Sequence, residues 1–180
     1  PIISGSMAIF VQLGGNIVRD LGYNYLSDSY DGSELTILAN HLFEGKQILD
    51  MAYSKEPNRI IWCVMSDGTV NALTYNPSQK ISAWHNHTTK GDFESVATIR
   101  EGNEDNVYFV VKRQINNQTV RYIERMKSRT IKTLENGFFL DSALSSDFDT
   151  YVTTVSGFEH LKGETINALL DFGVVENLVV

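Results

Sequence analysis

The stretch Ile60-Ile61-Trp62-Cys63-Val64-Met65 is followed by Ser66-Asp67-Gly68-Thr69 and then by Val70-Asn71-Ala72-Leu73-Thr74-Tyr75. Two short apolar runs are thus separated by a turn signal, in which Gly68 supplies the positive φ that a tight reversal needs. This pattern predicts a β-hairpin. Similar runs recur along the chain and predict an antiparallel β protein. We expect strands near 8–12, 16–20, 48–53, 59–65, 69–75, 80–85, 94–99, 106–112 and 119–126.

The hairpin belongs to a larger unit that occurs twice. Residues 48–75 read as strand, turn, apolar strand, turn and strand, and residues 94–126 read in the same order. The units align with offsets of 46, 47 and 50 residues, which place Met51 over Ala97, Ile60 over Val107, and Val70 over Val120. A period of ~40 to 50 residues built from short antiparallel strands is typical of propeller blades.

We therefore expect a mainly β fold with at least two antiparallel, propeller-like blades, about 48–87 and 94–126, repeating every 47 residues or so. Residues 81–87 are the expected outer, fourth strand of the first blade. The second blade has no clear equivalent, because the sequence turns polar after Met126. A propeller needs ~4 or more blades to close, and two blades leave sheet faces uncovered. Either other segments complete the ring, or partner copies do, or the chain is a piece of a longer protein.

One segment departs from the strand pattern. Between Ser33 and Phe43 the apolar residues stand at 35, 38, 39 and 42, a spacing of three and four that is typical of a helix. Ser33 can act as the N-cap, and Gly45 follows where a left-handed residue is favoured. We expect one short helix here.

The domain organisation follows from composition. Residues 1–127 form the expected, partial propeller-like domain. Residues 128–150 are polar and rich in Ser and Asp, with one apolar cluster at Phe138-Phe139-Leu140, and are predicted to be a linker. Residues 151–180 begin a small β domain, with strands expected near 153–157 and 165–171.

Composition and charge exclude several functions. The 180-residue chain is 42% hydrophobic and 21% charged, as is ordinary for a folded soluble protein. A net charge of −7 argues against sequence-independent binding of nucleic acid and against an anionic membrane surface. No run approaches the ~18 to 20 apolar residues of a membrane span. The single Cys63 excludes an internal disulfide and, inside an apolar run, is expected to be a buried thiol.

Two histidines are the weak candidates for a metal site. His85 and His87 stand two apart on an expected strand, so their side chains share a face. A site needs at least a third ligand, which the neighbouring sequence does not supply. The simpler interpretation is a pair of polar residues at a strand end, and we expect neither a metal nor a cofactor.

Carboxylates are plentiful, but no spacing selects a catalytic pair. Glycoside cleavage needs two of them, and most of the candidates lie in Gly-containing turns, where acidic residues are common. The candidates are Asp67, Asp92, Glu94, Glu101, Glu104 and Asp105. The chain also lacks a nucleophile elbow, a phosphate-binding Gly loop and paired metal-binding cysteines. We expect a protein that is not an enzyme.

Residues 121–129 are the one locally basic stretch. Strand alternation places Arg121, Ile123 and Arg125 on one face. A solvated face or a protein interface explains this better than nucleic-acid binding does. Arg121, Arg125 and Trp84 are therefore the candidate interface residues.

Short segments in a fixed order carry a family likeness over nearly the whole chain from residue 8. The segments are Phe10-Val11-Gln12, Val18-Arg19-Asp20-Leu21-Gly22-Tyr23, Leu35 to Phe43, Ile61-Trp62, Asp67-Gly68, Leu73-Thr74-Tyr75, Ala83-Trp84-His85, Glu94-Ser95-Val96, Arg121 to Arg125 and Val155 to Thr165. This ordered set resembles phage and prophage tail structural proteins of the tail nozzle or tail tubular type.

The resemblance implies an internal fragment of a longer virion protein that is made in the bacterial host cytoplasm. In the tail, propeller-like and smaller β domains would build a conduit for DNA exit. The implied partners are other copies of the chain in a ring and other tail proteins, without sequence-specific nucleic-acid binding. The acidic balance suits a wall that repels phosphate.

Two other functions stay open. A receptor- or glycan-binding propeller module would present exposed Trp or Tyr residues, with Trp84 as the candidate. A carbohydrate-active enzyme would need two carboxylates ~5 to 9.5 Å apart in a pocket.

Overall fold

The computed structural model describes residues 1–131, 133, 137, 139–171 and 173–180. These residues form four antiparallel sheets, and the described part contains no α-helix. The expectation of a mainly antiparallel β fold is confirmed. None of the described helical turns is long and apolar enough to cross a membrane.

Three sheets are meanders in chain order, and the fourth is a single hairpin. The N-terminal sheet contains β1 (Ile2–Ser4), β2 (Met7–Val11), β3 (Val18–Asn24) and β4 (Ser29–Asp31). The central sheet contains β5 (Ile48–Ser54), β6 (Ile60–Met65), β7 (Val70–Asn76) and β8 (Ile81–His87). The third sheet contains β9 (Asp92–Glu101), β10 (Glu104–Ile115) and β11 (Gln118–Arg125). The C-terminal hairpin pairs β12 (Thr165–Leu170) with β13 (Gly173–Val179).

Strand β6 lies at the middle of the stack, and all six of its residues are buried. On one face Ile61, Cys63 and Met65 pack in a core with residues of the N-terminal sheet. On the other face Ile60, Trp62 and Val64 pack with residues of the third sheet. A strand covered on both sides is continuously apolar, which accounts for the unbroken run in its sequence.

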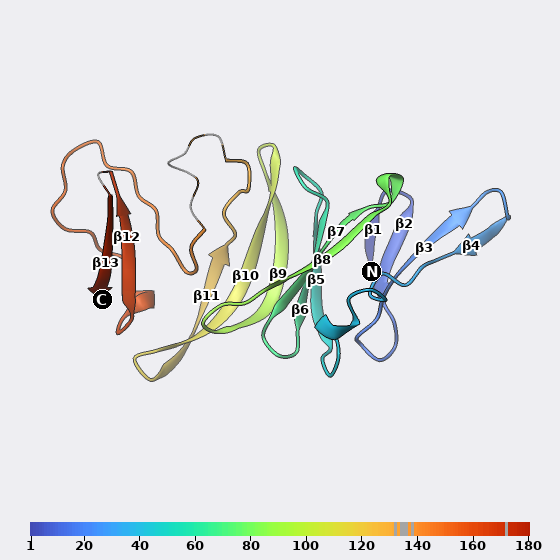
Figure 1. Ribbon diagram of the computed structural model, residues 1–180, viewed down its shortest axis with the longest axis horizontal. Coiled ribbons are helices and arrows are strands. Elements are labelled where there is room, and N and C mark those ends of the chain that lie inside the picture. The colour runs from blue at the N-terminus through green and yellow to red at the C-terminus, as the bar shows by residue number, and fades with distance from the viewer. Residues whose placement is uncertain (132, 134–136, 138, 172) are drawn as a thin grey trace.

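The first strands of successive sheets lie next to each other. Ser4 of β1 donates a hydrogen bond from Oγ to the Tyr53 hydroxyl of β5 at 3.0 Å. Ser95 of β9 donates from Oγ to Asp50 of β5 at 2.7 Å. Figure 1 shows the three sheets arranged side by side along the long axis, with the C-terminal hairpin beyond β11. The sheets therefore stack face against face in chain order.

The predicted helix over 33–43 is wrong. Glu34 forms an isolated bridge with Arg19, and only the short 3-10 turn η1 (Asn40–Leu42) is helical. Leu35 and Phe43 are buried in the core that β6 shares with the N-terminal sheet. Leu35, Ala39 and Phe43 point into this core from an irregular segment, whereas Leu38 is exposed, so tertiary packing overrides the local pattern.

Other expectations are corrected at the two ends of the chain. Strands β1 and β4 were not predicted, so the N-terminal sheet is larger than expected. No strand forms at 153–157, whereas the strand expected at 165–171 is β12. Residues 132, 134–136 and 138 of the predicted linker, including one Phe of its apolar cluster, lie outside the described residues. The described sheets stack without closing a ring, so the propeller arrangement stays a prediction.

We predict that Ile61→Ala lowers the free energy of unfolding by ~2 to 5 kcal/mol, because it leaves a cavity in a core strand. Ile61 is fully buried, whereas Ile123 is 78% exposed. The same substitution at Ile123 serves as the matched control and should cost less than about 1 kcal/mol. Urea unfolding followed by tryptophan fluorescence measures both. Equal losses at the two positions would contradict the placement of β6 at the centre of the stack.

Candidate functional site

The outer face of the third sheet, turned away from the central sheet, carries exposed apolar side chains. Ile123 is 78% exposed and Ile99 is 51% exposed. Ile123 lies opposite Val110 in the β10–β11 register, and Ala97 lies opposite Tyr108 in the β9–β10 register. We call these five residues, Ala97, Ile99, Tyr108, Val110 and Ile123, the outer patch. Such a patch on a sheet face is typical of a protein contact surface.

Three ion pairs surround the outer patch. They are Arg121–Glu94 at 2.6 Å, Arg125–Glu101 at 3.2 Å and Lys112–Asp92 at 2.7 Å. The predicted alternation along β11 is confirmed, because residues 121, 123 and 125 are exposed while their neighbours are partly covered. The two candidate interface arginines thus frame Ile123. Their role in an interface stays a prediction.

The ion pairs determine the charge of this face. The hydrogen bond from Arg121 holds the pKa of Glu94 below its ordinary value, and Glu94 raises the pKa of Arg121 in return. Both groups therefore remain ionised near neutral pH. Each cation at the patch has an adjacent carboxylate, so the basic stretch predicted at 121–129 does not produce a basic surface here. Exposed pairs of this kind add little stability and mainly set orientation.

The opposite side of β11 contains an ion pair that the sequence did not reveal. Arg113 of β10 is only 4% exposed and reaches Glu124 of β11 at 2.5 Å. Its guanidinium also donates to the Lys90 carbonyl at 2.8 Å and to the Thr89 hydroxyl at 2.9 Å. The ion pair joins β10 to β11, and the two hydrogen bonds attach this edge of the third sheet to the loop before β9. Only the strand register brings residues 113 and 124 together, so spacing in the sequence gives no signal.

Trp84 is engaged within the chain. Its indole Nε1 donates to the Leu35 carbonyl at 2.7 Å, and its ring meets Phe43 edge to face at 4.7 Å. Trp84 thereby attaches β8 to the irregular 33–43 segment. Its role in an interface stays a prediction. Within the chain, the two contacts already engage its indole N–H and its ring.

The two candidate histidines lie together on β8. His85 Nδ1 and His87 Nε2 are 2.8 Å apart and form a hydrogen bond. Both rings pack against the Trp62 ring, with centroid distances of 6.1 and 5.3 Å. The Arg129 guanidinium carbon lies 6.0 Å from the same ring. Among the described residues no group of three or more possible ligands forms around the pair, so the third ligand is not supplied there.

The surroundings of these histidines disfavour their charged form. Burial lowers the pKa of His87 to about 4, and His85 and Arg129 add to the effect. Burial also lowers the pKa of His85, with Arg129 as the second cause. Both imidazoles are therefore neutral at neutral pH. Their arrangement suits an aromatic contact between β6 and β8 better than proton transfer.

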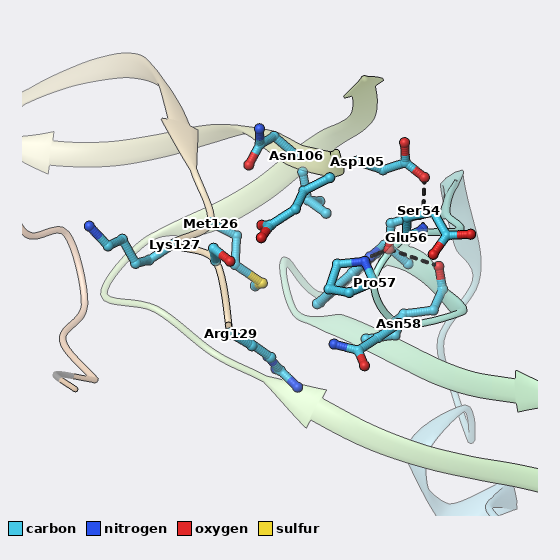
Figure 2. A pocket seen from close by; sticks show the side chains of 14 residues that line it. Ser54, Glu56, Pro57, Asn58, Asp105, Asn106, Met126, Lys127 and Arg129 are labelled. Carbon is cyan, nitrogen blue, oxygen red and sulfur yellow. Dashed lines mark hydrogen bonds between the residues drawn. The ribbon is translucent and has the colours of Figure 1, made fainter. Parts of the chain in front are cut away.

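A small cavity lies between the ends of the central and third sheets. Figure 2 shows Met126, Lys127 and Arg129 on one side of it and Glu56 and Pro57 on the other. Its volume is about 40 Å³, enough for a few water molecules. Sites for organic ligands measure roughly 300 to 1,000 Å³. The cavity therefore does not accommodate a sugar.

Two of the carboxylates singled out for catalysis, Asp105 and Asp67, are bound within the fold. Asp105 at this cavity accepts hydrogen bonds from the backbone N–H groups of Lys55 and Glu56 at 2.7 and 2.9 Å. These bonds and Arg100 keep its pKa below the ordinary value, despite the opposing effect of burial. Asp67 pairs with Lys46 at 2.8 Å in the β6–β7 turn. An ionised Asp105 cannot act as the proton donor that glycoside cleavage requires.

Comparison with known proteins adds no identification. No family model matches the chain, and no curated protein matches it.

We predict that stability falls as the pH is lowered from 7 to 4, in part through His85 and His87. The folded-state pKa of each lies below the unfolded value of ~6.5, so the unfolded chain binds more protons in this interval. Below about pH 4 the His87 contribution no longer changes. The double variant His85→Gln with His87→Gln should show a smaller drop in Tm between pH 7 and pH 4.5. An identical drop in both proteins would contradict the burial of the pair.

Proposed function

We propose that the chain is a structural part of a phage tail, of the nozzle or tubular type, which acts by packing against neighbouring protein and not by catalysis. One observation carries the proposal. The stack ends in uncovered apolar side chains on two sheets, with Ile123 at 78% and Ile3 at 67% exposure. Surfaces of this kind are characteristic of proteins that work in an assembly.

The order of the sheets supports the propeller component of the proposal. Each of the three stacked sheets is a meander, and the first strands β1, β5 and β9 are neighbours through the contacts of Tyr53 and Asp50. Consecutive propeller blades pack in this order, with their first strands around a common axis. We infer that these sheets are consecutive blades and that further sheets complete the ring.

The tail setting comes from the segments that resemble phage tail proteins. A net charge of −7 suits a conduit through which DNA passes, because a negative wall does not retain phosphate. In this proposal the protein is made in the bacterial host cytoplasm and then assembled into the tail of the virion, next to copies of itself and other tail proteins.

Electron microscopy of purified particles that carry a gold-labelled copy tests this role. We predict that the label lies at the tail, because the proposed contacts are with tail proteins. Particles with the unlabelled protein define the background. A label on the capsid, or none on intact particles, would reject the tail role.

A receptor- or glycan-binding module is the second candidate, and exposed aromatic residues favour it. Tyr25 and Tyr30 on the β3–β4 hairpin are 85% and 74% exposed, and Leu26 beside them is 96% exposed. Tyr23 and Tyr30 pack edge to face at 5.6 Å. Figure 1 shows this hairpin extending away from the stack. Exposed tyrosines supply large, rigid contact area at low entropic cost.

Under this second candidate, the double variant Tyr25→Ala with Tyr30→Ala should weaken binding to intact host cells at least about tenfold, since aromatic residues dominate such contacts. Flow cytometry with the fluorescently labelled chain measures the change. Leu38→Ala is the matched control, because Leu38 is 93% exposed but lies outside the hairpin. Equal binding by both variants would reject this function for the hairpin.

A further inference from the structure

The stack presents two uncovered sheet faces, one at each end. At one end is the outer patch of the third sheet. At the other end the N-terminal sheet turns Ile3, Leu21 and Tyr23 outward, at 67%, 39% and 52% exposure. We call the outward side of β1, β2 and β3 the N-terminal face. Neither face is covered by other described residues.

Inside the chain, sheet contacts follow one rule. The N-terminal sheet covers one face of the central sheet, and the third sheet covers the other, with first strands adjacent each time. We call the face of a sheet that is turned toward the next sheet in chain order its rear face, and the opposite face its front face. Each contact therefore joins the rear face of one sheet to the front face of the next. The outer patch lies on a rear face without a partner sheet, and the N-terminal face is a front face without a partner sheet.

We propose that a second copy of this chain covers the outer patch with its own N-terminal face, so that β1 of one copy lies beside β9 of the other. This inference rests on the packing function proposed above and names the partner. The contact continues the sheet order that already exists inside the chain. It is heterologous, since different surfaces meet, and it can build a ring or an open chain of copies.

The charges on the two faces permit this contact. The three cations around the outer patch are each paired with a carboxylate, and Glu104, opposite Glu101 in the β9–β10 register, adds one negative charge to this face. On the N-terminal face the outward positions of β1, β2 and β3 include one charged residue, Arg19. Contact between the faces thus buries apolar side chains without opposing like-charged clusters.

Sedimentation equilibrium of the full 180-residue chain over a range of concentrations tests the proposal. We expect a mass that rises with concentration. Ile3→Asp and Ile123→Asp should each raise the dissociation constant at least about tenfold, because either buries an unpaired carboxylate. Ile37→Asp is the matched control, since Ile37 is 65% exposed and lies on neither face. Circular dichroism confirms that each variant is folded.

Mixing the two variants distinguishes the heterologous contact from its alternatives. Ile3→Asp keeps an intact outer patch, and Ile123→Asp keeps an intact N-terminal face. We expect the equimolar mixture to form dimers at a concentration at which each variant alone is monomeric. A wild-type chain that stays monomeric, a mixture that is monomeric at that concentration, or an Ile3→Asp variant that dimerises as tightly as the wild-type chain would overturn the proposal.

The result is separable from the tail role. A monomeric chain rejects this contact but leaves the gold label free to appear at the tail. A label absent from the tail rejects the tail role but leaves the measured self-association intact.

Discussion

Burial of β6 on both faces is the constraint on which the rest of the structure depends. Its six residues alternate between two cores, so the strand requires one sheet on each side. Ile61 and Cys63 need the N-terminal sheet, whereas Trp62 and Val64 need the third sheet. The far face of each outer sheet has no such partner sheet. A stack of three layers is therefore fully packed at its centre and leaves apolar side chains exposed at its two ends.

Polar groups in the two contacts between sheets, which we call the seams, make the stacking specific. Asp20 on β3 is buried, and it accepts a hydrogen bond of 2.6 Å from the Tyr75 hydroxyl on β7. Burial, followed by this contact with Asp20, raises the pKa of Tyr75, so the tyrosine stays a donor. At the other seam Asp50 accepts from Ser95 at 2.7 Å and from the Val96 backbone N–H at 3.0 Å. An unmatched carboxylate at either seam would be costly, which disfavours slipped arrangements of the sheets.

Much of this fold was predictable, because it is encoded by local signals. The apolar run at 60–65 and the Gly68 turn predict their hairpin without any knowledge of the partners. The spacing at 33–43 misled, since Leu35, Ala39 and Phe43 serve one core without forming a helix. Contacts such as Arg113 with Glu124, or Trp62 with His87, depend on strand register and sheet stacking. Such partners lie far apart in the sequence, so pattern alone could not pair them.

The outer patch differs from the buried faces in a way that bears on its use. Inside the stack, Phe109 and Val111 meet apolar partners, and Arg113 lies at the sheet edge, where it pairs with Glu124. On the far side of the same strands, Val110 lies in a row with Tyr108 and Lys112, among paired charges. A face that is always buried would not need those ion pairs, and a face that is always solvated would not need Ile123. An apolar centre within a rim of paired charges is the arrangement that the proposed contact with a second copy requires.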